Sequence, residues 1–382
     1  MGIAARVAFT IGLTMLAGAE GRAGTATRAP FGTAADGVVE AITLRNSHGM
    51  TVSFLTRSGK IIDIEAPDRK GVMANLVLSQ RDFAAWDGSG SFNSIVGRFA
   101  NRIDKGGFTL DGQTYALPGS NPKTGVSIHG GPNNGFSGKL WTAKLFERAG
   151  ASGATLSLVS PDGENGYPGE LSVDVTYTLT DANVLRLDYH ATTTKPTVIN
   201  LTNHAYFNIG GAASGAVYDQ VLQVFASHYT PTDDRSIPTG EIAPVAGTPF
   251  DLRKPRPSGE LIYAANPQIV MARGLDHNFV LDKPAGVALP VAIRLHDPRS
   301  GRQMEVRTTE PGVQIYSSNG FNGSTIGANG RPLRQSDALA FETQHYPDSP
   351  NKPNFPTTVL RPGENFRSTT EFAFSTDAKP FK

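Results

Sequence analysis

The chain of 382 residues contains no cysteine, which excludes disulfide bonds and anchoring through a lipid-modified cysteine. It also lacks an excess of charge. The 35 basic and 34 acidic residues leave a net charge of +1, so nothing electrostatic favours nucleic acid or an anionic membrane as a partner. The densest basic run, residues 253–256, is short and interrupted by proline, as expected of a solvated loop. Long apolar runs are also scarce. Residues 7–19 form an uncharged apolar run, but a membrane-spanning helix needs roughly 20 residues.

The first 19 residues predict a secretory signal peptide. Arg6 supplies a positive start, residues 7–19 form the apolar centre, and Ala17 and Ala19 are the small residues that a signal peptidase recognises. We expect cleavage after Ala19, with Ala23 as the second choice. A buried N-terminal helix is the alternative interpretation. Export predicts a periplasmic or secreted protein that has no membrane contact once its signal is removed.

Short runs of alternating apolar and polar residues dominate the rest of the chain, with 42 glycines and 26 prolines among them. The clearest run is 171–180, followed after a turn by 185–190, and together they predict an antiparallel hairpin. Similar, weaker runs lie at 38–44, 51–56, 60–64, 154–159, 221–225, 291–295 and 304–308. Strands at this spacing, without amphipathic helices between them, predict an all-β fold, a large antiparallel β-sandwich. Short helices such as 259–263 are expected only as connectors.

The domain organisation follows from the absence of a linker. No segment rich in proline, serine or glycine divides the mature chain, and no repeat has a fixed period. We therefore predict one β-sandwich domain over residues 36–382. Residues 20–35 are small and polar, and we expect them to form a flexible leader before the first strand.

Residues 200–208 hold the densest group of chemically useful side chains, with a histidine, a tyrosine, a threonine and three asparagines. Residues 195–199 predict the start of a strand. If the strand continues, alternation places His204 and Tyr206 on one face and Asn203 on the other. Histidine titrates near neutral pH, so such a face suits proton transfer. A histidine satisfied by its neighbours in a polar loop is the simpler alternative.

Two polar clusters precede this stretch. Within residues 97–103, Asn101 and Arg102 can donate several hydrogen bonds to a polyhydroxylated ligand. His129 precedes two glycines that permit close backbone approach, which predicts a place at the rim of a pocket. Each signal is weak alone, because an arginine after a glycine-rich turn is more often a surface residue.

Further candidates lie in the second half of the chain. Asp276 and His277 point to opposite faces of an extended chain, and Asp276 is the better acceptor for sugar hydroxyls. Gln314 and Tyr316 share one face of another predicted strand. Glu342 follows an apolar run, where a carboxylate is costly unless it is paired or functional. Partial burial raises the pKa of such a group and makes it a better base near pH 7.

Taken together, six sequence words closely resemble the aldose 1-epimerase (galactose mutarotase) family, in the same order and spacing. They are GRFANRI (97–103), SIHGG (127–131), NLTNHAYFNIGG (200–211), GLDHNF (274–279), GVQIYSSN (312–319) and FETQHYPDSPN (341–351). The resemblance covers roughly the whole chain after the leader. It implies the mutarotase type of large antiparallel β-sandwich, with sugar bound in an open cleft on its concave face. It also implies interconversion of the α and β anomers of galactose, glucose and related aldoses.

The resemblance implies roles for individual residues. His204 corresponds to the general acid of the family and Glu342 to its general base. The remaining candidates are expected to bind the monosaccharide. They are Asn101, Arg102, His129, Asp276 and Gln314, which fall on the family's sugar-binding positions, and Tyr206, which shares the face of His204.

The implied chemistry needs one acid and one base. A cyclic aldose is a hemiacetal, and inverting C1 requires loss of the proton on the C1 hydroxyl and gain of one by the ring oxygen. The ring opens, the C1–C2 bond rotates, and closure occurs on the other carbonyl face. No cofactor, metal or covalent nucleophile is required. We expect an ionised Glu342 and a protonated His204 in the resting enzyme when it binds the α anomer, because neighbouring opposite charges stabilise one another and help to keep His204 charged near pH 7.

Three other functions fit some of these residues. A carbohydrate-binding β-sandwich without activity would need the sugar contacts but no matched acid and base. His129, His204, Asp276 and Glu342 include the side-chain types that ligate iron or zinc. Asp276 and Glu342 also fit the pair of carboxylates that a glycoside hydrolase uses.

Overall fold

The computed structural model describes residues 24–119, 121 and 123–378. The predicted signal peptide therefore lies outside the described residues. Within them, no helix is both long enough and apolar enough to cross a membrane.

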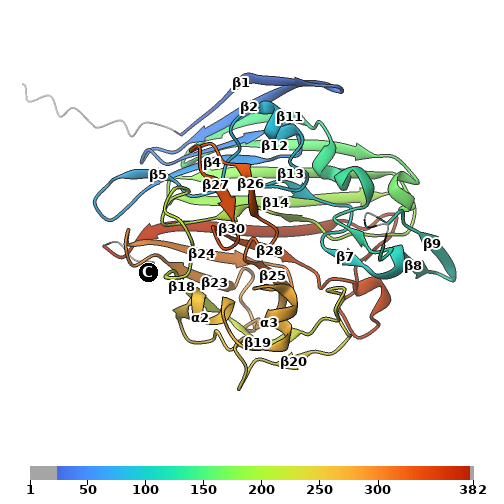
Figure 1. Cartoon of the computed structure of the whole chain (residues 1–382). Helices are drawn as coiled ribbons and strands as arrows, with labels where there is room; N and C mark the ends of the chain where they lie inside the picture. The colour runs from blue at the N-terminus through green and yellow to red at the C-terminus, as the bar shows by residue number, and fades with distance from the viewer. Residues whose placement is uncertain (1–23, 120, 122, 379–382) are drawn as a thin grey trace, which may run out of the picture.

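A nine-stranded antiparallel sheet is the largest element of the fold (Figure 1). Its strands, in spatial order, are β11 (Thr142–Arg148), β12 (Ala151–Ser160), β13 (Leu171–Thr180), β14 (Val184–Thr193), β30 (Phe366–Thr376), β24 (Arg302–Thr308), β23 (Val291–His296), β18 (Val221–Val224) and β21 (Arg256–Pro257). The predicted hairpin is confirmed as β13 and β14, which pair from Leu171 with Thr193 to Leu179 with Leu185. Alternate residues of β13 are buried, as the sequence pattern predicts for a sheet with one face in the core.

Two smaller antiparallel sheets complete the main architecture. The five-stranded sheet contains β1 (Thr25–Ala34), β2 (Gly37–Arg45), β3 (Thr51–Leu55), β4 (Ile61–Pro67) and β5 (Met73–Asn75). The six-stranded sheet contains β17 (Tyr206–Phe207), β28 (Leu339–Gln344), β25 (Gly312–Tyr316), β22 (Asp276–Leu281), β19 (Ala226–Thr230) and β20 (Ala243–Pro244). Figure 1 shows the five-stranded sheet at the top of the view and β19 and β20 at the bottom.

Both smaller sheets pack on the same face of the nine-stranded sheet. Phe54 of β3 stacks on Tyr177 of β13, with ring centroids 4.3 Å apart. Phe207 of β17 contacts Phe372 of β30, with centroids 4.9 Å apart. The register of β13, β14 and β30 places Tyr177 and Phe372 on one face of the large sheet. The expected all-β sandwich is therefore confirmed, with one layer made of nine strands and the other of two sheets.

The prediction of a flexible leader over residues 20–35 is wrong for residues 25–34, and its first four residues lie outside the described chain. Residues Thr25–Ala34 form β1, which pairs with β2 along its whole length and has a bulge between Pro30 and Gly32. Most β1 side chains are exposed, so the strand has no apolar alternation that sequence reasoning can detect. Backbone pairing holds β1 to the sheet, helped by an edge-on contact between Phe31 and Phe83.

Short ribbons and helices join the sheets. The two-stranded ribbons are β6 (Ile95–Val96) with β16 (Thr202–Asn203), β7 (Arg102–Ile103) with β10 (Ser127–Ile128), β8 (Gly107–Leu110) with β9 (Gln113–Ala116), β15 (Thr197–Val198) with β29 (Val359–Leu360), and β26 (Asn322–Ile326) with β27 (Pro332–Arg334). The α-helices of the described chain are α1 (Phe83–Asp87), α2 (Ser258–Ile262) and α3 (Pro267–Ala272). Single 3₁₀ turns occupy Asp104–Gly106, Glu164–Gly166 and Ser349–Asn351, and a longer one Pro132–Gly138. The predicted connector at 259–263 corresponds to α2.

Candidate active site

Strand alternation in the six-stranded sheet separates a core face from a polar face. On β28, Thr343 faces the nine-stranded sheet, because its hydroxyl lies 2.6 Å from that of Thr370 on β30. Glu342 therefore points to the opposite face. Gln314 of β25 lies directly across from Glu342 in the sheet register. Asp276 begins the next strand, β22, two residues before the partner of Gln314, so all three polar side chains share one face.

His204 lies where the chain passes from one sheet to another. It follows β16, which pairs with β6, and precedes β17, which pairs with β28. Its backbone is held on both sides: its N–H donates to the Ser94 carbonyl at 2.9 Å, and its carbonyl accepts from the Asn93 N–H at 3.1 Å. The Asn93 side chain also accepts from the Tyr206 N–H at 2.8 Å. His204 and Tyr206 face the same cluster, as predicted, with ring centroids 4.9 Å apart.

The ribbon of β7 and β10 brings Asn101, Arg102 and His129 to the same place. Asn101 and His129 both have left-handed backbones, with φ of 61° and 51°. The two residues bond reciprocally: the His129 N–H donates to the Asn101 carbonyl at 2.9 Å, and the Asn101 N–H donates to Nδ1 of His129 at 3.2 Å. In the neutral ring of His129 the proton therefore lies on Nε2, which makes this atom a hydrogen-bond donor.

The centre of the site is the contact between Glu342 and His204. Oε1 of Glu342 lies 3.5 Å from Nε2 of His204, and both side chains are almost fully buried. His129 and Tyr316 present their rings edge-on to His204, with centroids 5.4 and 6.1 Å away. Oε2 of Glu342 is buried without a hydrogen-bond partner among the described residues. The carboxyl group of Glu342 and the imidazole of His204 are thus held together, and Oε2 of Glu342 remains free to accept a hydrogen bond from a ligand.

Burial works against the protonation states that are expected from the sequence for sugar binding. Burial raises the pKa of Glu342 to about 8, with the Asp276 charge as a smaller contribution in the same direction. Burial also lowers the pKa of His204 to about 4. At pH 7 the pair therefore contains a neutral carboxylic acid and a neutral imidazole, because desolvation opposes both charges more strongly than the neighbours favour them. The pair still shares one titratable proton.

Asp276 is the ionised carboxyl of the site, paired with the Arg102 guanidinium. Its two oxygens accept from Nη2 of Arg102 at 3.0 Å and from Nε2 of Gln314 at 2.7 Å. Burial acts to raise the pKa of Asp276, but the Arg102 charge and these hydrogen bonds outweigh it and hold the pKa below its usual value. With both oxygens engaged, Asp276 is a poor candidate for the second carboxylate of a glycoside hydrolase.

His129, His204 and Glu342 are close enough to be considered as metal ligands, because one nitrogen or oxygen of each lies within 4.8 Å of the others. A histidine that ligates through Nε2 carries its proton on Nδ1. In His129, however, Nδ1 accepts from the Asn101 N–H, so the neutral ring has its proton on Nε2. The three residues therefore do not fit a metal ion, and His129 is better suited to donate to a sugar oxygen.

Sequence reasoning missed the aromatic wall beside His204. Phe92 stacks on Tyr206 with centroids 5.0 Å apart, and Phe321 lies 5.0 Å from Tyr206. Tyr316, noted in the sequence only as a neighbour of Gln314, has its hydroxyl held by the Gly320 N–H at 2.7 Å. No pattern marks Phe92 or Phe321, because both lie in irregular segments without periodic neighbours.

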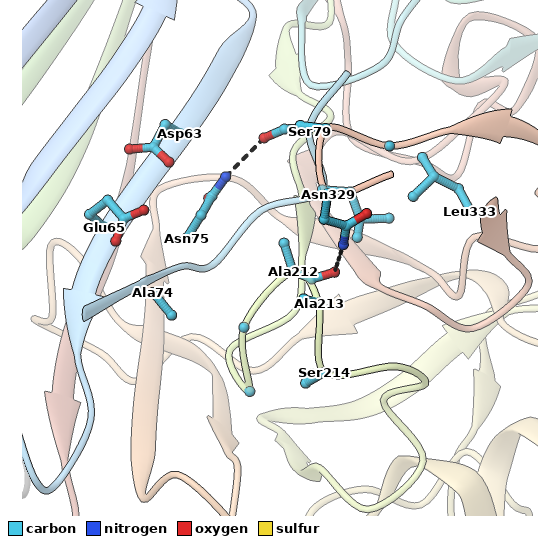
Figure 2. A pocket seen from close by; sticks show the side chains of 15 residues that line it. Asp63, Glu65, Ala74, Asn75, Ser79, Ala212, Ala213, Ser214, Asn329 and Leu333 are labelled. Carbon is cyan, nitrogen blue, oxygen red and sulfur yellow. Dashed lines mark hydrogen bonds between the residues drawn. The ribbon is translucent and has the colours of Figure 1, made fainter. Parts of the chain in front are cut away.

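A separate cavity of about 600 Å³ lies between β4, β5 and the segments 210–214 and 327–333 (Figure 2). Asp63 and Glu65 line one wall, and burial followed by the Glu65 charge raises the pKa of Asp63 to about 7. The amides of this cavity bond to the protein itself: Asn75 donates to Ser79 at 2.9 Å, and Asn329 donates to the Ala212 carbonyl at 3.3 Å. Its two carboxyl groups, those of Asp63 and Glu65, interact with each other.

Comparison with known proteins agrees with this geometry. The sequence profile described as aldose 1-epimerase matches residues 40–373. Galactose mutarotase of Rattus norvegicus is 41% identical over 355 residues, covering 91% of this chain and 98% of the relative. Aldose 1-epimerase of Escherichia coli K12 is 35% identical over 337 residues, covering 87% and 94%. The crystal structure of galactose 1-epimerase from Lactobacillus acidophilus superimposes with a TM-score of 0.81 at 28% identity, covering 92% of this chain and 99% of that one.

Proposed function

Because the chain belongs to the aldose 1-epimerase family, we propose that it is an isomerase that interconverts the α and β anomers of D-galactose, D-glucose and related aldohexoses. One observation supports this function above the others. Glu342 and His204 are 3.5 Å apart on a face that also carries the hydrogen-bonding groups of Arg102, Asp276 and Gln314. A monosaccharide needs this combination: polar groups for its hydroxyls, and one acid with one base for C1.

The proton balance of the reaction fits the pair. In the form with ionised Glu342 and protonated His204, Glu342 takes the proton of the C1 hydroxyl while His204 gives one to the ring oxygen. The C1–O5 bond breaks, C1 becomes an aldehyde, and the pair is left as neutral carboxylic acid and neutral imidazole. After rotation about C1–C2, Glu342 returns a proton to the aldehyde oxygen and His204 takes one from the C5 hydroxyl. Closure on the other face restores the starting form.

The neutral pair of the resting protein is thus the form that accompanies the open-chain sugar. Both oxygens of the reaction are bonded to C1 in the ring, so two groups that lie side by side can each reach one of them. Sugar hydroxyls that donate to Glu342 favour its ionised form, because they replace the hydrogen bonds lost on burial. Each member of the pair is expected to contribute about 10²–10⁴ to the rate.

The remaining site residues are proposed to hold the sugar. Arg102 and Gln314 position the Asp276 carboxylate, which accepts from sugar hydroxyls. His129 donates through Nε2, and Asn101 fixes its ring. Tyr206 supplies an apolar surface beside His204.

Polarimetry on freshly dissolved pure anomers tests the function. We expect the protein to accelerate the change in optical rotation of α-D-glucose and α-D-galactose above the spontaneous rate, and to do so in excess chelator. A protein that binds galactose without accelerating mutarotation would be a carbohydrate-binding module instead. Release of reducing sugar from a disaccharide would indicate a glycoside hydrolase.

We also propose that the protein is exported. The support is the sequence of residues 1–19, with Arg6 before an apolar run and small residues at its end. N-terminal sequencing of the protein from its native cells is expected to begin at Glu20. A mature protein that retains Met1 and remains in the cytoplasmic fraction would contradict export.

A further inference from the structure

Lys60 is a buried lysine whose ammonium bonds to the segment 89–92. It precedes β4 and is only 1% exposed. Its ammonium donates to the Ser89 hydroxyl at 3.2 Å, to the Gly90 carbonyl, and to the Phe92 carbonyl at 3.4 Å. An ammonium has three N–H donors, and all three are used within one turn of the chain. Lysine is rarely buried so completely unless such partners are present.

The turn that Lys60 holds is the segment that supports His204. Phe92 provides the ring that stacks on Tyr206, and Tyr206 in turn contacts the ring of His204. The next residue, Asn93, donates its N–H to the His204 carbonyl and accepts from the Tyr206 N–H. A shift of the 89–92 turn would therefore be transmitted through two rings and two hydrogen bonds to the imidazole.

The charge of Lys60 also acts on His204. The pKa of Lys60 is lowered to about 7, mainly by burial and to a smaller extent by the Arg57 charge, while the Asp87 charge acts in the opposite direction. The positive charge of Lys60 is in turn one of the causes that lower the pKa of His204. The charged groups that act on Lys60 are thus Arg57 and Asp87, which pair with each other, and Arg57 also pairs with Asp36.

We propose that Lys60 is a positioning residue for the acid–base pair: its ammonium holds the 89–92 turn against which Tyr206 and His204 are placed. The proposal rests on the proposed mutarotase function of His204 and goes beyond it, because Lys60 touches neither Glu342 nor the sugar-binding groups. A neutral Lys60 amine has two N–H donors for the three oxygens of Ser89, Gly90 and Phe92. It also lacks the positive charge that lowers the pKa of His204.

Substitution of Lys60 by Met keeps an unbranched side chain one atom shorter than lysine and removes both the hydrogen bonds and the charge. Lys60→Arg keeps the charge, and Lys144→Met, at an exposed position on β11, is the matched control. We expect Lys60→Met to lower kcat by up to about 100-fold and to change KM less. The reason is that a shift of the 89–92 turn misplaces the imidazole of His204, and small misplacements of a catalytic group have effects of this size. We also expect the acid limb of its pH–rate profile to move to higher pH. Lys60→Arg is expected to keep the acid limb of the wild type, and Lys144→Met to match the wild type throughout.

A measurement independent of activity separates this proposal from the proposed function. The carbon-13 chemical shifts of the His204 ring are followed against pH in wild type and in Lys60→Met. We expect the midpoint of the His204 titration to lie at a higher pH in the variant. This result does not depend on catalysis and is expected even if the protein is inactive on every sugar. If Lys60→Met does not fold, the wild type alone is sufficient: the Tyr206 and His204 resonances are expected to shift together with the midpoint of the Lys60 Nζ titration, near pH 7. The proposal would be overturned if the midpoint of the His204 titration were unchanged in the variant. It would also be overturned if the Tyr206 and His204 resonances of the wild type did not change with the Lys60 titration.

Discussion

Oε1 of Glu342 and Nε2 of His204 lie 3.5 Å apart, although 138 positions separate the two residues along the chain. Both are buried, and burial moves their pKa values in opposite directions, to about 8 and about 4. Between these values the pair holds one titratable proton. A reaction that removes one proton from a sugar and returns one to it is matched to such a pair, because the total charge does not change during the cycle.

The pH dependence of catalysis follows from this shared proton. Below about pH 4 the pair gains a second proton and loses its base, and above about pH 8 it loses its last proton and with it the acid. We therefore predict a bell-shaped profile of kcat/KM with limbs near these two values, which are properties of the pair. Polarimetry from pH 3.5 to 9.5, corrected for spontaneous mutarotation, measures the profile. A value of kcat/KM that rises with a midpoint near pH 6.5, as the titration of an exposed histidine would give, would contradict this prediction.

Glu342 is expected to reduce stability at alkaline pH. Its folded pKa of about 8 lies above its ordinary value of 4.5, so its burial costs nothing below pH 4.5 and progressively more as pH rises to 8. Glu342→Gln removes a charge that the fold disfavours. We predict that the variant unfolds at a higher urea concentration than wild type at pH 8.5, by a free energy of up to a few kcal/mol. The difference is expected to disappear at pH 4.5, and a variant less stable at pH 8.5 would refute the assignment of burial as the cause.

The Arg102–Asp276 pair is predicted to act mainly in sugar binding. Asp276→Asn removes the charged acceptor and leaves the guanidinium without its counter-charge. Hydrogen bonds to charged groups contribute about 1.5–3 kcal/mol, so kcat/KM is expected to fall by about 10- to 100-fold, mostly through KM. Asp188→Asn, which disrupts the more exposed Arg186–Asp188 pair on the nine-stranded sheet, serves as the control. Equal effects of the two substitutions on kcat/KM would exclude the role given to Asp276.

Tyr177 links the core to the site. Its hydroxyl donates to the Gly59 carbonyl at 2.8 Å and accepts from the Asn203 side chain at 3.3 Å. Tyr177→Phe leaves both partners buried and unsatisfied, which costs about 1–3 kcal/mol of the unfolding free energy. Urea unfolding measures this loss, with Tyr263→Phe as the control because Tyr263 is 70% exposed. A loss equal to that of the control would show that the two hydrogen bonds do not stabilise the fold.

The sequence predicted what strand alternation and local motifs encode. The hairpin of β13 and β14 was predictable because apolar residues alternate along both strands. The convergence of His204 and Glu342 was not visible in periodicity and came from the resemblance of whole motifs to a family. Strand β1 escaped detection because its stability comes from backbone pairing, which leaves no trace in side-chain pattern.

Burial depends on long-range packing, and for this reason the protonation of the site could not be predicted. The sequence places a glutamate after an apolar run, but it does not give the extent of desolvation of the carboxyl and of the imidazole together. Lys60 escaped notice for the same reason. Its partners Ser89, Gly90 and Phe92 lie about 30 positions away in a segment without a recognisable pattern.

The mutarotation rate of Glu342→Gln, measured by polarimetry on α-D-galactose at pH 7, tests the central claim most directly. Gln keeps the shape of the side chain but can neither give nor take the shared proton. We predict that kcat falls by about 10²–10⁴ relative to wild type while the variant keeps its fold and its affinity for galactose. A kcat within a few-fold of wild type would show that the contact between Glu342 and His204 does not carry the reaction.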